Sequence, residues 1–123
     1  MNVTIVPGTL EGAVTPPSSK SQTHRAVLAL MLAQGEGKLS NLAVSEDIQA
    51  TQDCVAALKS GQPAQADGLP LLDCGESGST LRFLIPVALA VRGGGHFTGR
   101  GRLMERPQGP YIRLFEEKGI LWN

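Results

Sequence analysis

The sequence predicts an α/β (α+β) fold built from repeated units, and three observations support this prediction. Short stretches rich in apolar and β-branched residues, as in strands, alternate with stretches that have the apolar spacing of helices. Serine precedes the first two helical stretches and glycine closes most of the four, as residues at helix caps do. The order of elements then recurs further along the chain, which indicates an internal repeat.

Five stretches have the composition or alternation of short strands, and turn residues bound most of them. The first stretch (VTIVPG) closes with a Pro-Gly turn, and the last (ILWN) resembles the beginning of a strand. The predicted strands are residues 3–8, 37–42, 69–74, 94–99 and 120–123.

Four stretches have the spacing and end signals of helices. Ser18 or Ser19 is expected to cap the first helix, and Ser45 the second. Pro86 lies inside the third and is expected to kink it or to set its effective start, whereas Pro110 breaks the fourth early. The predicted helices are residues 20–35, 46–61, 77–91 and 106–119.

The chain repeats itself when it is shifted by 57 residues, which aligns Thr23 with Thr80 and Arg25 with Arg82. Each copy opens with small polar residues before a buried helix that carries an arginine. Repeated units that cannot bury their own apolar faces must stack on neighbours, and two copies are fewer than such an array needs. We therefore expect this chain to be part of a larger protein.

The composition is that of a globular chain and argues against a nucleic-acid partner. With 123 residues and 41% hydrophobic residues, the chain is long enough for one domain with a modest core. Eleven basic residues balance 11 acidic residues, so no basic excess is available to coat a polyanion. Aromatic residues make up only 4%, which leaves little for base stacking. Any anion must be recognised by a few placed cations.

Cysteine usage and hydropathy point to a reduced compartment. Cys54 and Cys74 have no CxxC or metal-ligand spacing and are expected to be buried thiols, so no metal site is predicted. The apolar run at residues 26–33 is too short for a bilayer, and residues 1–8 lack the features of a signal peptide. The expected location is the cytoplasm, without membrane contact.

The start of the first helix is a candidate anion site. Lys20 and Ser21 stand at its amino end and Arg25 follows one turn later, where free N–H groups and the helix dipole favour an anion. The alternative is that Ser19 caps the helix while Lys20 and Arg25 are solvated. His24 is expected to be a packing or surface residue and not a ligand.

Two further stretches are candidate anion sites, because each is expected near the start of a helix. Residues 75–80 (GESGST) connect a strand to a helix, and Gly78 lets a ligand approach the backbone, although such turns are common. Arg82 in the following helix has two interpretations: it contributes to this anion site, or it has a structural role. Arg106 precedes Pro107, which can occupy the first position of a helix, so Arg106 is expected at a helix start. A charged turn is the alternative. The three stretches together suggest a small, multiply anionic metabolite.

The three stretches, in this order, resemble the EPSP synthase (3-phosphoshikimate 1-carboxyvinyltransferase) family. Residues 16–26 (PPSSKSQTHRA) are similar to its Ser-Lys-Ser…Arg signature, and residues 72–84 (LDCGESGSTLRFL) to its glycine-rich loop. Residues 97–107 (FTGRGRLMERP) look like its motif ending in Glu-Arg-Pro. Glu76 stands where other members have Asn, so no ligand contact is assigned to it.

The resemblance implies an inverse α/β barrel-like fold of two domains, each with three βαβαββ units and with substrates in the cleft between them. This chain would be a truncated N-terminal part. Residues 1–15 would be a strand and linker toward the second domain, residues 16–74 the first unit, and residues 75–123 an incomplete second unit.

The resemblance also implies the reaction, the transfer of the enolpyruvyl group from phosphoenolpyruvate to the 5-hydroxyl of shikimate 3-phosphate, without a metal or organic cofactor. Lys20 would be catalytic, touching both substrates and supporting proton transfer. Ser21 and Arg25 would hold shikimate 3-phosphate. Gly78, through its backbone, and Arg106 would hold phosphoenolpyruvate.

Other readings of the sequence remain open. The acid and base groups of the family lie in the part that this chain lacks, so the chain alone is expected to have little or no activity. The alternative function is a non-catalytic module that binds an anion or self-assembles, with a second copy or the remainder of the enzyme covering its apolar faces. A nucleotide-binding βαβ fold is disfavoured, since no acidic residue follows a glycine fingerprint at the required distance.

Overall fold

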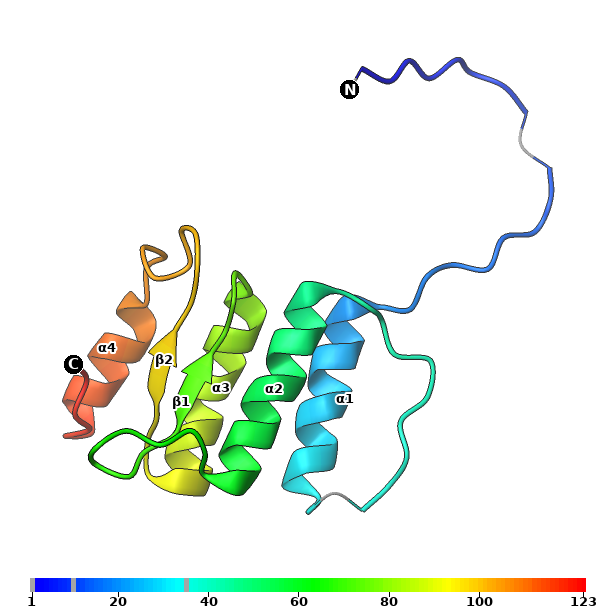
Figure 1. Cartoon of the computed structure of the whole chain (residues 1–123). Coiled ribbons are helices and arrows are strands. Elements are labelled where there is room, and N and C mark those ends of the chain that lie inside the picture. Colours follow the sequence, from blue (N-terminus) through cyan, green and yellow to red (C-terminus); the bar gives the residue numbers. More distant parts are fainter. Residues whose placement is uncertain (1, 10, 35) are drawn as a thin grey trace.

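The structure, a computed structural model, describes residues 2–9, 11–34 and 36–123. Within these ranges it is a mixed α/β arrangement of four helices and a two-stranded parallel sheet (Figure 1). The predicted α/β class is therefore confirmed at this level. The elements are α1 (Lys20–Leu32), α2 (Glu46–Ser60), β1 (Leu71–Asp73), α3 (Gly78–Arg92), β2 (His96–Thr98) and α4 (Gly109–Glu117).

The helices share one direction, and this brings their polar starts to one edge of the molecule. In Figure 1 the four helices run downward from their amino ends, while β1 and β2 run upward. α1 packs on α2, and α2 packs on α3 and on β1. β1, α3 and β2 form a βαβ unit in which Leu72 is paired with Phe97. The helix starts and the strand ends therefore lie on the same side.

The first two helices begin where their caps predict. Ser19 Oγ accepts the N–H of Gln22 at 3.3 Å, and Ser45 Oγ accepts the N–H of Ile48 at 3.3 Å. α2 ends at Ser60 and is capped by Gly61, whose φ of 74° is the left-handed conformation that glycine adopts readily. α1 ends at Leu32. Gly35, its predicted end, lies outside the described residues.

The third helix begins at Gly78, so Pro86 does not set its start and that alternative is wrong. Ser77 Oγ accepts the N–H of Thr80 at 3.2 Å and fixes the first turn. Pro86 instead lies in the interior of the helix, which continues to Arg92.

Two of the predicted strands are present, and three are absent from the described residues. Residues 69–74 contain β1 and residues 94–99 contain β2. The prediction of strands at 3–8, 37–42 and 120–123 is wrong for this structure, because no other described segment pairs with the backbone of these stretches to form a sheet. Apolar side chains in the first stretch are solvated: Val3 is 70% exposed and Ile5 is 87% exposed. Extended residues without a partner do not form a sheet.

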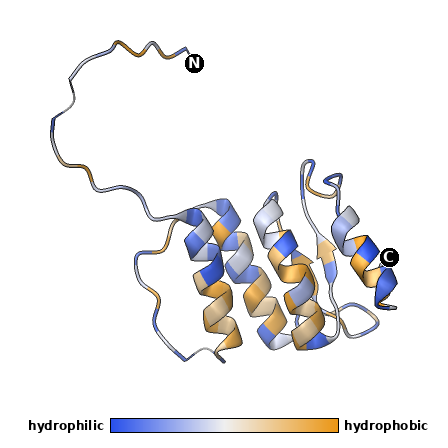
Figure 2. Ribbon diagram, turned by 180° about the vertical axis from the view of Figure 1, so that it is seen from behind, coloured by the Kyte–Doolittle hydropathy of each residue, from blue (hydrophilic) through white to orange (hydrophobic). Residues whose placement is uncertain are grey.

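The hydrophobic core lies between the helices and the sheet and leaves the helix starts polar. Leu58, Leu72 and Leu84 are fully buried, and Leu103 and Phe115 extend the core toward α4. Figure 2 shows hydrophilic residues at the amino ends of α1 and α2 and hydrophobic residues along their carboxyl halves. The polar edge is thus free to meet a ligand. Among the described residues, no helix combines the length and apolarity that crossing a bilayer requires.

Candidate anion-binding site

A cavity of about 360 Å³ opens at the amino end of α3, and we call it the α3 pocket. It takes residues from α2, from the loop before α3, from α3 itself and from the loop before α4. Its lining residues are Asp47, Glu76, Gly78, Ser79, Arg82, Phe83 and Arg106.

Gly78 and Arg106 are brought together in this pocket. A side chain at Gly78 would clash with the terminal guanidinium nitrogen of Arg106, so that guanidinium lies directly against the first residue of α3. The first N–H groups of a helix have no acceptor within the helix. At the start of α3, Ser77 Oγ accepts a hydrogen bond from the N–H of Thr80. The N–H groups of Gly78 and Ser79 therefore stand beside the Arg106 cation.

The predicted position of Arg106 at the start of its own helix is wrong. α4 begins at Gly109 and carries Pro110 in its first turn, so Pro110 starts this helix and does not break it. The fixed φ of proline suits the first turn, which explains the later start. Arg106 thus reaches the start of α3 from a loop.

The α1 residues border the α3 pocket through two of its lining side chains. The Lys20 ammonium forms an ion pair with the Asp47 carboxylate. The Arg25 guanidinium lies 5.4 Å from the centre of the Phe83 ring, a cation–π distance. Lys20 and Arg25 are therefore held by side chains that line the pocket. Ser21 is exposed, and its backbone carbonyl accepts a hydrogen bond from the Arg25 guanidinium at 3.0 Å.

Several pocket residues were not predicted from the sequence. Asp47 lies in the first turn of α2, and its carboxylate forms an ion pair with Lys20 on α1. A structural role was one interpretation of Arg82 from the sequence, and the structure places Arg82 in the lining of the pocket. The alignment of Arg25 with Arg82 in the internal repeat was the available signal. Nothing in the sequence alone indicated Phe83 as the partner of Arg25.

His24 is buried beside the pocket, with 1% of its surface exposed. Its Nδ1 lies 2.7 Å from Thr51 Oγ1. Burial is the main cause that lowers its pKa; Lys20 and Arg25 lower it further, while Asp47 raises it. His24 is therefore a packing residue, one of the two alternatives expected from the sequence, and its lowered pKa favours the neutral imidazole.

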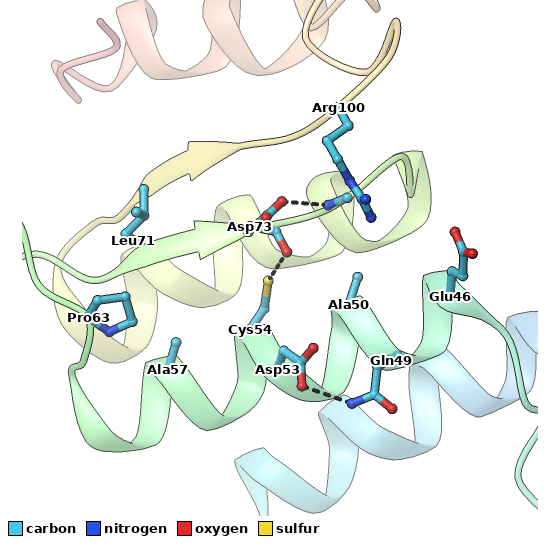
Figure 3. Close-up of a pocket in the computed structure, with 11 residues that line it drawn as sticks. Glu46, Gln49, Ala50, Asp53, Cys54, Ala57, Pro63, Leu71, Asp73 and Arg100 are labelled. Carbon is cyan, nitrogen blue, oxygen red and sulfur yellow. Dashed lines mark hydrogen bonds between the residues drawn. The ribbon is translucent and has the colours of Figure 1, made fainter.

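A second cavity, of about 350 Å³, lies between α2 and the sheet and has a different character (Figure 3). Glu46, Asp53 and Asp73 give it three carboxylates against the single cation of Arg100. Cys54 Sγ donates to the Asp73 carbonyl at 3.2 Å. The excess of carboxylates over cations makes this cavity unsuitable for an anion. In the α3 pocket the cations of Arg82 and Arg106 balance the carboxylates of Asp47 and Glu76, so the α3 pocket is the candidate site. Within the described ranges, no three His, Cys, Asp or Glu side chains gather as a metal site.

Comparison with known proteins agrees with the motifs. The family model of EPSP synthase (3-phosphoshikimate 1-carboxyvinyltransferase) matches residues 5–121. The 3-phosphoshikimate 1-carboxyvinyltransferase of Clostridium beijerinckii is 38% identical over 141 aligned residues, covering 99% of this chain and 32% of that protein. Proteins of the same name from Clostridium perfringens (strain SM101) and Clostridium novyi are each 39% identical, and the alignments cover 98% and 99% of this chain.

The chain spans about a third of the length of the curated relatives it matches. No solved structure matches it. The family match covers nearly all of its residues, and the three motif stretches lie within that match. The chain therefore belongs to the EPSP synthase family.

Proposed function

We propose that this chain supplies the N-terminal part of the site that transfers the enolpyruvyl group from phosphoenolpyruvate to the 5-hydroxyl of shikimate 3-phosphate, a step of aromatic amino-acid biosynthesis. One observation carries the proposal: three stretches far apart in sequence converge on the α3 pocket. Gly78 and Arg106 line it, and Lys20 is held at its wall by Asp47.

The chemistry of the pocket suits the binding of phosphoenolpyruvate. Free N–H groups at a helix start and a planar guanidinium both favour phosphate and carboxylate oxygens. Gly78 brings the backbone close to the ligand, and Arg106 supplies the cation beside it. In this proposal Ser21 and Arg25 hold shikimate 3-phosphate at the border of the pocket.

Lys20 has the catalytic role in this proposal. The substrate hydroxyl loses its proton and its oxygen forms a bond to C2 of phosphoenolpyruvate while C3 gains a proton, which gives the tetrahedral intermediate. The C2–O bond to phosphate then breaks and C3 loses a proton, which restores the double bond in the enolpyruvyl group. Lys20 touches both anions, offsets their mutual repulsion and supports the proton transfers. Its ion pair with Asp47 keeps the ammonium at the pocket before the substrates arrive. The acid and base groups would come from the remaining two thirds of the enzyme.

The whole enzyme would have the inverse α/β barrel fold that the family motifs imply. In that fold the outer edge of the β1–β2 sheet is expected to pair with strands of further units. Residues 3–8, which are exposed and extended, are expected to pair only when the second domain is present.

The test combines binding with complementation. Calorimetry should detect binding of phosphoenolpyruvate to the chain, and Arg106→Ala should abolish it. Arg113→Ala is the matched control, because Arg113 is an exposed arginine of α4 outside the pocket. Phosphate release should require added protein corresponding to the C-terminal two thirds of the Clostridium beijerinckii relative. Turnover by the chain alone, or no binding of either substrate by the wild-type chain, would contradict the proposal.

Self-association is the second candidate function, and one observation favours it. A largely apolar cavity of about 640 Å³ lies between α3, β2, α4 and the carboxyl-terminal residues, with Leu89, Phe97 and Trp122 among its lining. Leu121 beside it is 81% exposed. A second copy that covered this surface would make the chain a dimer, which sedimentation analysis would reveal. Leu121→Asp should then return it to the monomer.

A further inference from the structure

Four buried polar side chains form one continuous hydrogen-bonded chain across three helices. His24 on α1 lies 2.7 Å from Thr51 on α2, Thr51 lies 2.7 Å from Thr80 on α3, and Thr80 donates to Ser77 at 2.7 Å. None of the four is more than 1% exposed. We call this set, His24, Thr51, Thr80 and Ser77, the hydroxyl chain.

Both ends of the hydroxyl chain adjoin residues of the candidate site. His24 directly precedes Arg25 and lies one turn after Lys20 on α1. Ser77 caps α3 and directly precedes Gly78. The two ends thus belong to the helix starts that carry the predicted contacts for the two substrates.

The middle of the hydroxyl chain is attached to the residue that holds Lys20. The Asp47 carbonyl oxygen lies 3.1 Å from the Thr51 hydroxyl oxygen and 3.2 Å from the Thr80 hydroxyl oxygen, so it is a second acceptor within reach of both hydroxyl protons. The carboxylate of the same residue forms the ion pair with Lys20. A shift of either threonine would therefore move Asp47 and, with it, the lysine.

The proton of His24 fixes the direction of the hydroxyl chain at its α1 end. Each hydroxyl has one proton to donate, and His24 Nε2 is buried and has no hydrogen-bond partner among the residues that the structure describes. A buried N–H without an acceptor is rarer in proteins than an acceptor without a donor. His24 therefore carries its proton on Nδ1 and donates to Thr51, while the protons of Thr51 and Thr80 are shared between the next hydroxyl of the chain and the Asp47 carbonyl.

We propose that His24, Thr51 and Thr80 are positioning residues, which hold the amino ends of α1, α2 and α3 in the arrangement that a phosphorylated carboxylate requires. The three side chains do not touch the ligand and act through Asp47 and Ser77. This inference deepens the proposed function and rests on it for the identity of the ligand.

The test compares Thr51→Val, which keeps the shape of threonine but removes the hydroxyl, with Thr51→Ser, which keeps the hydroxyl. We expect Thr51→Val to bind phosphoenolpyruvate about fivefold to tenfold more weakly, and Thr51→Ser to stay within about twofold of the wild type. Thr15→Val is the control, because Thr15 lies exposed in the extended segment before α1.

A ligand-free readout separates positioning from binding. Long-range ¹H–¹⁵N spectra report the tautomer of His24, and His96→Asn identifies the signals of the other histidine. We expect Thr51→Val to change the His24 tautomer signals and to shift the amide signals of Ser21 and Gly78. Thr51→Ser should leave all of them near their wild-type positions.

The outcomes distinguish this inference from the proposed function. Thr51→Val with wild-type affinity for phosphoenolpyruvate would overturn the inference. If the wild-type chain binds no phosphoenolpyruvate, the proposed function fails, and the amide signals then test the positioning role alone. Unchanged signals in Thr51→Val would overturn this role. Signals that change in Thr51→Val but not in Thr51→Ser would support it. If Thr51→Val does not fold, the double variant His24→Phe/Thr51→Val replaces it, because it leaves no unpaired imidazole.

Discussion

The hydroxyl of Tyr111 on α4 donates a hydrogen bond to the backbone carbonyl of Arg82 on α3, at 2.7 Å. Within a helix this carbonyl would accept from the N–H of the residue four positions later. That residue is Pro86, which has no N–H. Tyr111 thus supplies the missing donor and ties α4 to α3 below the α3 pocket.

We expect Tyr111→Phe to lower the free energy of unfolding by about 1 kcal/mol, the usual contribution of one hydrogen bond. In a Pro86→Ala background the helix supplies its own donor, so the same change should cost clearly less. Urea denaturation of the four proteins completes this double-mutant cycle. Equal costs in both backgrounds would mean that Tyr111 does not compensate for Pro86.

Arg92 at the end of α3 caps the carboxyl end of α2. Its Nε donates to the Leu58 carbonyl at 2.6 Å, and a terminal nitrogen donates to the Lys59 carbonyl. Carbonyls at a helix end have no partner within the helix and favour a cation. Arg92→Ala should therefore lower the free energy of unfolding by about 1–2 kcal/mol. The exposed Arg113→Ala should change it by less than about 0.5 kcal/mol, and a similar loss in both variants would refute the capping role.

Gly78→Ala should separate ligand binding from folding. The added methyl group displaces the Arg106 guanidinium, which is flexible, so the free energy of unfolding should change by less than about 1 kcal/mol. Affinity for phosphoenolpyruvate should fall strongly in calorimetry, because Arg106 leaves the start of α3. Gly109→Ala is the matched control: Gly109 also begins a helix, and its added methyl group would only reach ordinary contact with Arg113, at 3.9 Å. Unchanged affinity in Gly78→Ala would contradict this geometry.

The starts of α1 and α2 were predictable from the sequence because their determinants are local. A serine hydroxyl that caps a helix accepts an N–H three residues along, so Ser19 and Ser45 define the starts of α1 and α2 by themselves. Strands need a partner from elsewhere in the chain. The stretches at 3–8 and 37–42 have strand composition, but they remain unpaired within the described residues.

The candidate site could be predicted only as separate pieces. Its polar residue types were visible, but their partners are distant in sequence: Arg106 meets Gly78, and Lys20 meets Asp47. The family resemblance selected which residues to consider, while the shared direction of the helices explains why they meet (Figure 1). His24 shows the same limit, because its burial depends on hydroxyl groups that two other helices supply.

The two cysteines are predicted to be unreactive while the chain is folded. Cys54 is 1% exposed and Cys74 is fully buried, which confirms the expectation of buried thiols. The hydrogen bond with Cys54 and burial raise the pKa of Cys74, so the reactive thiolate is suppressed. Iodoacetamide followed by mass spectrometry should label neither cysteine in buffer and both in urea. Rapid labelling of Cys74 in buffer would show that the core opens there.

The buried imidazole of His24 should make the chain less stable as the pH falls. Burial lowers the pKa of His24 in the folded state below 6.5, and the positive charges of Lys20 and Arg25 act in the same direction, while Asp47 opposes them. The unfolded chain then takes up a proton first as the pH falls below 6.5, which favours unfolding. The stability that the neutral His24 contributes is fully present above the pKa of this residue in the unfolded chain. It is lost as the pH falls toward the lower pKa of His24 in the folded chain.

The free energy of unfolding should therefore decrease between pH 6.5 and pH 5, by up to about 1.4 kcal/mol per pH unit from this one group. Urea denaturation at closely spaced pH values measures the slope. His24→Asn removes the titrating imidazole but keeps a polar side chain beside Thr51, so its slope in this window should be smaller by that contribution. His96→Asn is the control, because His96 is exposed and pairs with Asp67 at the surface. Should His24→Asn keep the full slope, the pH dependence would originate elsewhere, and the imidazole would not be held neutral by its burial between the three helices.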